Sequence, residues 1–127
     1  MNYFLFKLYP PRVTFPADIT RAEGKLIQEH SDYWSQLMNR GFVLAFGPVV
    51  DPKGTYCIAI IQLEDGGVAI PVCSNDPMIL ANVGFTFEVQ SLPLLRLPQP
   101  TYPIVPTEQC PEYEVTSQFS SIYLLPT

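Results

Sequence analysis

Apolar positions along the first part of the chain follow two spacings, which predict one long helix set among strands. Over residues 21–39 apolar side chains recur every three or four positions, as on the buried face of a helix. The members of this stripe are Leu26, Ile27, Tyr33, Trp34, Leu37 and Met38. Thr20 precedes the segment and Glu23 follows three residues later, which is the pattern of a capping box. Gly41 is suited to end the helix.

Four other segments have the alternation or the β-branched and aromatic content of strands, at residues 2–9, 42–46, 55–63 and 85–91. Gly47 and Pro48 are expected to end the second of these segments. Between the third and the fourth, residues 68–75 predict a short helix, provided that Pro71 lies in its first turn. Residues 78–82 predict a further helical turn.

The resulting order is β-α-β-β-α-β, which predicts an α+β fold of the ferredoxin-like kind, with two helices on one face of a four-stranded antiparallel sheet. This arrangement leaves the other sheet face apolar. In a chain of 127 residues we expect a second copy to cover that face, so the protein is predicted to be a homodimer.

The composition changes after residue 92, which separates a predicted domain at 1–92 from a proline-rich C-terminal arm at 93–127. Six prolines fall between Pro93 and Pro111, and charged residues are few. Such a segment is extended and polyproline-like. Its apolar residues predict that the arm lies along the body of the protein or across a partner subunit, and residues 114–124 could add a strand.

Charge and cysteine content exclude several classes of protein. The net charge is −5, and the 7 basic residues form no cluster, which argues against binding to nucleic acid. No stretch is long and apolar enough to span a membrane, and the first residues lack a secretory pattern, so a cytoplasmic location is expected. Cys57, Cys73 and Cys110 are odd in number and widely spaced, which predicts neither disulfides nor a metal site. Cys73 is notable only because Asp76 follows three residues later.

His30 is the only histidine, and it is the one side chain with an ordinary pKa, about 6.5, near neutral pH. It lies three residues after Ile27 and four before Trp34, so it should lie on or beside the buried face of the helix. A single histidine in this position is either a packing residue or a group for acid–base chemistry.

Several short motifs together resemble the YCII-related family of small α+β proteins. They are Pro10-Pro11-Arg12, Glu29-His30 followed by Tyr33-Trp34, Phe46-Gly47-Pro48, Asp51-Pro52-Lys53-Gly54-Thr55, Asn75-Asp76-Pro77 and the run from Gly84 to Val89. The resemblance extends from Asn2 to about Leu92. Two features depart from the family pattern: the glycine- and proline-containing segment at 66–71, where charged helix formers are usual, and the arm from Pro93 onward.

The resemblance implies a dimeric α+β barrel, similar in fold to muconolactone isomerases, with His30 and Asp76 as a catalytic pair in a pocket between sheet and helices. Relatives include enzymes that eliminate halide from chlorinated hydroxyquinols. A histidine oriented by a carboxylate is the simplest general base, and such a pair needs no metal and no cofactor.

The predicted function is that of a cofactor-independent lyase or isomerase acting on a small cyclic or aromatic substrate, by dehydration, dehydrohalogenation, tautomerisation or cyclisation. The residues expected to bind the substrate are Tyr3, Trp34, Phe46 and Phe85, with Arg12 as the partner of an anionic group. Arg12 is equally well explained as a surface arginine. Two alternatives remain open: a non-catalytic small-molecule-binding or accessory protein on the same fold, and an interaction module built on the arm.

Overall fold

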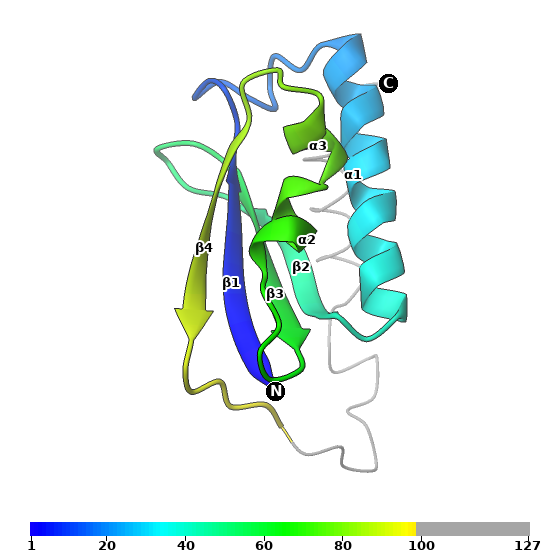
Figure 1. The fold of residues 1–127 in the computed structure, drawn as a ribbon. Helices are drawn as coiled ribbons and strands as arrows, with labels where there is room; N and C mark the ends of the chain where they lie inside the picture. Colours follow the sequence, from blue (N-terminus) through cyan, green and yellow to red (C-terminus); the bar gives the residue numbers. More distant parts are fainter. Residues whose placement is uncertain (99–127) are drawn as a thin grey trace, which may run out of the picture.

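The computed structural model describes residues 1–98. Its elements are β1 (Asn2–Tyr9), α1 (Arg21–Asn39), β2 (Val43–Val49), β3 (Tyr56–Leu63), α2 (Ile70–Ser74), α3 (Pro77–Leu80) and β4 (Thr86–Leu92) (Figure 1). All of them fall within the predicted domain at 1–92. Residues 99–127, which hold Cys110, the predicted strand at 114–124 and most of the predicted arm, lie outside the described residues.

The four strands form one antiparallel sheet in the order β2-β3-β1-β4. In the central strand, Phe6 lies opposite Ala59 of β3 on one side and Val89 of β4 on the other. The three helices lie on the same side of this sheet (Figure 1). The prediction of an α+β fold with a four-stranded antiparallel sheet is therefore confirmed.

The long helix α1 has the predicted bounds, because its signals are local. The backbone N–H of Glu23 donates to the Thr20 hydroxyl at 3.1 Å, and the Thr20 N–H donates to the Glu23 carboxylate at 2.9 Å, which completes the capping box. Its buried residues are Glu23, Ile27, His30 and Trp34. Their spacing of four, three and four places them on one face toward the sheet.

The core lies between this helix face and the inner face of the sheet. Alternate residues of β1 and β3 are buried, namely Phe6, Leu8, Cys57, Ala59, Ile61 and Leu63. The Phe6 and Trp34 rings stack with their centroids 4.7 Å apart. Leu5, Ile58 and Ile60 alternate with the buried positions and so face the opposite side of the sheet, where no helix of residues 1–98 lies (Figure 1).

The end of the second strand needs correction. Strand β2 does not end at Gly47 and Pro48 but continues to Val49, with Pro48 opposite Cys57. Because β2 is an edge strand, a proline can occupy it without removing a ladder hydrogen bond from a central strand. The short helix and the further helical turn predicted at 68–75 and 78–82 are present as α2 and α3, which are separated at Asn75 and Asp76. Pro71 lies in the first turn of α2, as required.

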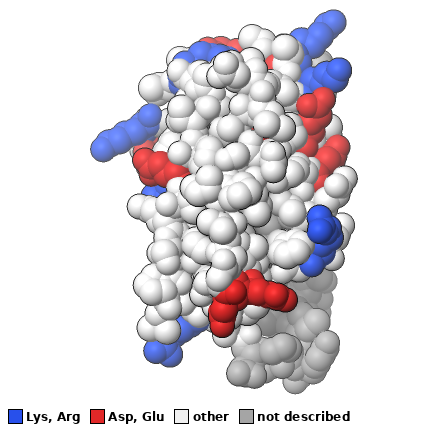
Figure 2. Space-filling view, viewed as in Figure 1, with Lys and Arg blue, Asp and Glu red and all other residues white. Residues whose placement is uncertain are grey.

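The surface of the described part is largely uncharged in the view of Figure 2, where acidic and basic side chains lie toward the edges. Several apolar residues in and beside α2 and α3 are exposed, namely Val68, Ile70, Leu80 and Val83. No helix within residues 1–98 is long and apolar enough to cross a membrane.

Candidate active site

His30 and Asp76 are in direct contact. The Nδ1 atom of His30 lies 2.7 Å from Oδ2 of Asp76, although the two residues are 46 positions apart in the sequence. His30 comes from the buried face of α1, and Asp76 caps the N-terminus of α3. The break between α2 and α3 turns the Asp76 carboxylate toward α1. Both side chains are buried, with exposed fractions of 2% and 0%.

The Asp76 carboxylate accepts two further hydrogen bonds. The indole N–H of Trp34 donates to Oδ2 at 2.7 Å, and the backbone N–H of Met78 donates to Oδ1 at 2.9 Å. A buried carboxylate is costly unless donors surround it. These bonds therefore hold a negative charge in the core and fix the carboxylate against the imidazole ring.

The second ring nitrogen of His30 faces a cysteine that sequence analysis did not select. Nε2 lies 3.7 Å from Sγ of Cys57, a buried residue of β3. Burial lowers the pKa of His30, but the hydrogen bonds to Asp76 and Cys57 outweigh it and raise that pKa to about 9. The strand alternation of residues 55–63 could have placed Cys57 on the helix-facing side, but not beside His30. Cys73 is fully buried, and burial followed by the Asp76 charge raises its pKa to about 12.

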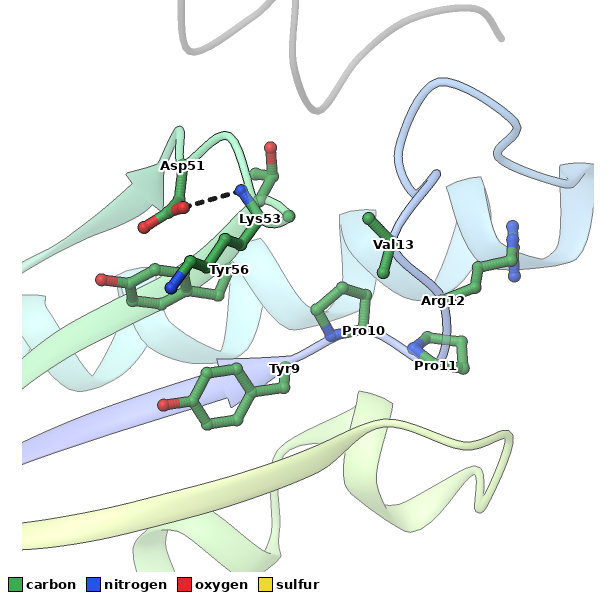
Figure 3. A pocket seen from close by; sticks show the side chains of 10 residues that line it. Tyr9, Pro10, Pro11, Arg12, Val13, Asp51, Lys53 and Tyr56 are labelled. Carbon is green, nitrogen blue, oxygen red and sulfur yellow. Dashed lines mark hydrogen bonds between the residues drawn. The ribbon is translucent and has the colours of Figure 1, made fainter.

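Two hollows lie at one end of the sheet. The outer cleft has a volume of about 340 Å³, and Figure 3 shows it between Tyr9, Tyr56 and the loops that carry Pro10 and Lys53. The inner hollow is only about 10 Å³ and is enclosed mainly by apolar side chains, namely Leu8, Phe15, Cys57, Met78 and Phe85. Pro10, Thr55 and Tyr56 line both, so the hollows are neighbours. Neither His30 nor Asp76 lines either of them.

The residues expected to bind the substrate are not gathered in one place. Phe85 lines the inner hollow, and Trp34 is buried against Asp76. Phe46 packs against the core from β2. Tyr3 alternates with the buried residues of β1, so it lies on the other sheet face, and it lines neither hollow.

Arg12 contributes to the outer cleft, but its guanidinium is already paired. It donates to both carboxylate oxygens of Asp18 at 2.9 Å and to those of Glu23 at 2.6 and 2.7 Å. Figure 3 shows the Arg12 side chain directed away from Tyr9 and Tyr56. An anionic substrate would have to displace these carboxylates.

No group of three histidine, cysteine, aspartate or glutamate side chains within residues 1–98 is arranged to hold a metal ion. Comparison of the chain with models of known protein families finds no match, and no curated protein matches it.

Proposed function

We propose that the protein is a small cofactor-independent lyase or isomerase in which His30 exchanges a proton with a cyclic or aromatic substrate. The observation that carries this proposal is the buried contact of 2.7 Å between His30 and Asp76. Because Asp76 is held by Trp34 and Met78, it fixes the orientation of the ring. A well-placed general acid or base contributes about 10²–10⁴-fold to a rate.

The nitrogen available for proton exchange is Nε2, because Nδ1 is engaged by Asp76. With a pKa of about 9, the ring is mainly the imidazolium at pH 7, and about 1% of it is the neutral base. A reaction that needs the neutral base should therefore become about tenfold faster for each unit by which the pH rises, up to about pH 9. A reaction that needs the acid should slow above pH 9.

Substrate access requires movement of side chains. The inner hollow of about 10 Å³ is too small for a cyclic compound, whereas the outer cleft of about 340 Å³ falls within the usual range for small-molecule sites. In the proposed mechanism Pro10, Thr55 and Tyr56, which line both hollows, move so that the two hollows join.

We further propose that the chain is a YCII-related protein with a ferredoxin-like fold that pairs as a dimeric α+β barrel. The antiparallel strand order β2-β3-β1-β4 and the helices on one face support this assignment. The apolar residues Leu5, Ile58 and Ile60 on the other face give a second copy a surface to cover.

The catalytic proposal is tested with the full chain and a panel of three probes: a chlorinated hydroxyquinol, an unsaturated five-membered lactone and a cyclic 1,3-diketone. Proton NMR in D₂O reports exchange or isomerisation, and chloride release reports elimination. We expect turnover of at least one probe and a loss of about 100-fold or more in His30→Gln. Glu29→Gln, an exposed neighbour on the same helix, is the matched control. Unchanged turnover in a folded His30→Gln protein would refute the proposal.

A second candidate is a non-catalytic small-molecule-binding protein, which is favoured by the absence of both His30 and Asp76 from the lining of the two described hollows. In that case a probe should shift the NMR signals of the cleft without being converted. Its affinity should be the same in wild type and in His30→Gln.

A further inference from the structure

Cys57, His30 and Asp76 form a continuous series of three side chains. Asp76 Oδ2 lies 2.7 Å from His30 Nδ1, and His30 Nε2 lies 3.7 Å from Cys57 Sγ. A thiol, an imidazole and a carboxylate in this order are the parts of an activated nucleophile, because the carboxylate orients the ring and the ring takes the thiol proton. Of the three, Cys57 lines the inner hollow, whereas His30 and Asp76 line neither of the two hollows described within residues 1–98.

We propose that Cys57 is the nucleophile of this site and that it adds reversibly to small conjugated carbonyl compounds. This inference rests on the proposed function and names its substrate class. A compound that enters from the outer cleft meets the sulfur before it meets the imidazole, because His30 lines neither described hollow. Proton transfer between substrate and ring then takes place beside the sulfur atom.

The proposed step is balanced without another reactant. When the sulfur attacks, the proton of the thiol–imidazole pair is on His30 Nε2, and a sulfur lone pair forms a bond to the β-carbon of an alkene conjugated to a carbonyl. The π electrons move to the carbonyl oxygen, and the resulting enolate takes the proton back from Nε2 at its α-carbon. Rotation about the single bond of the adduct, return of the α-proton to Nε2 and expulsion of the thiolate then give the compound with the geometry of its double bond changed, which is an isomerisation.

The lining of the inner hollow favours this substrate class. Leu8, Phe15, Met78 and Phe85 are apolar and suit an uncharged, planar molecule. A polarisable sulfur is a good nucleophile for a conjugated carbonyl once it is a thiolate. Acyl transfer would in addition require water to release the acyl group, and this apolar lining is a poor site for water.

The arrangement of the three side chains suits transfer of the thiol proton to the ring. His30 lies between Cys57 and Asp76, with Nδ1 toward the carboxylate and Nε2 toward the sulfur. The other ionisable groups near Asp76 are Cys73 and Tyr33, and their pKa values are raised by burial and by the Asp76 charge, so both are neutral at pH 7. The competing partner of the thiol is the backbone carbonyl of Ile58, at 3.7 Å.

Labelling with maleimide, a small cyclic conjugated carbonyl, tests the inference on the full chain. Peptide mapping by mass spectrometry separates adducts at Cys57, Cys73 and Cys110. At pH 6 an ordinary thiol with a pKa of about 8.5 is less than about 1% thiolate. We expect native Cys57 to react at least about tenfold faster at pH 6 than the same residue in urea-unfolded protein. Cys73, with its pKa of about 12, serves as the internal control and should stay unlabelled in the native state.

The variant His30→Gln should lose this advantage, whereas Glu29→Gln should retain it. A native rate no faster than the unfolded rate overturns the inference, as does an equal rate in wild type and folded His30→Gln. If His30→Gln does not fold, the comparison of native and unfolded wild-type protein decides alone.

The proposed enzyme activity and the proposed Cys57 nucleophile can each be refuted without the other. Fast labelling of Cys57 without turnover of any probe in the panel would support the reactive thiol and count against the proposed enzyme. Turnover that depends on His30 but is unchanged in Cys57→Ser would support the enzyme and overturn the nucleophile.

Discussion

Replacing Asp76 by asparagine removes the negative charge beside His30 while keeping the size of the side chain. Asp76 receives three donors: the His30 ring, the Trp34 indole and the Met78 backbone. An asparagine offers one oxygen and one NH₂ group. In either orientation its NH₂ group faces a donor that it cannot satisfy, the Trp34 indole or the Met78 N–H.

The loss of folding stability caused by Asp76→Asn should become smaller as the pH rises. The lost charge-assisted hydrogen bond and the unsatisfied donor each contribute about 1–3 kcal/mol, so we expect a destabilisation of about 4 kcal/mol at pH 6. The pKa of His30 is raised from 6.5 to about 9 in the folded wild type. This stabilisation is fully present below pH 6.5 and is lost as the pH rises through 9, and it amounts to about 3 kcal/mol. The difference between wild type and Asp76→Asn should therefore shrink to about 1 kcal/mol at pH 10.

Urea unfolding at pH 6 and pH 10, followed by the fluorescence of the single tryptophan, measures both values. Trp34 is fully buried, so unfolding changes its surroundings strongly. Lysine titrations affect both proteins alike and cancel in the difference. The Asp76 charge raises the pKa values of Tyr33 and Cys73 in the wild type alone, so their titration makes the difference fall further as the pH rises. Asp32→Asn is the matched control, because Asp32 is exposed on α1, and it should stay within about 0.5 kcal/mol of wild type. A cost below about 1 kcal/mol at pH 6, or a difference that does not fall with pH, would refute the reasoning.

Three further predictions concern residues of the loops and of α1 around the site, and all are checked by thermal or urea unfolding. Gly84 has a φ of +102°, and an added Cβ would lie 2.8 Å from the Cβ of Pro11, so Gly84→Ala should destabilise by about 1–3 kcal/mol. Gly24→Ala, in an open position within α1, should instead stabilise by about 0.5–1 kcal/mol, and a loss there would contradict the helix-propensity argument. Thr20→Ala should cost about 1 kcal/mol because it removes the helix cap, whereas Thr20→Ser should be close to wild type; equal stabilities of the two would argue against the cap.

The helix bounds and the strands of the sheet could be predicted from the sequence because their signals act over short distances. The capping box of α1 needs only Thr20 and Glu23, and the periodicity of the helix needs only its own residues. The end of β2 was predicted wrongly for the same reason. Whether Pro48 ends a strand depends on whether that strand lies at the edge of the sheet, and this depends on the pairing of distant segments.

Only part of the candidate site could be predicted from the sequence. The resemblance to the YCII-related family selected His30 and Asp76, and the helical spacing selected the buried face for His30. Cys57 was missed because its closeness to His30 arises when β3 packs beneath α1, across 27 positions of chain. Arg12 was expected to be available to an anion, and the structure pairs it with Asp18 and Glu23.

The sequence by itself determined the helix, the strand segments and the inward-facing side of each, because propensity, caps and alternation are properties of neighbouring residues. Tertiary structure alone decided which polar groups meet in the core. Burial removes water from His30, Asp76 and Cys57 together, so they are satisfied by one another, by the donors of Trp34 and Met78 and by the Ile58 carbonyl. The pKa of His30 follows from that assembly of residues and from no segment of the chain taken separately.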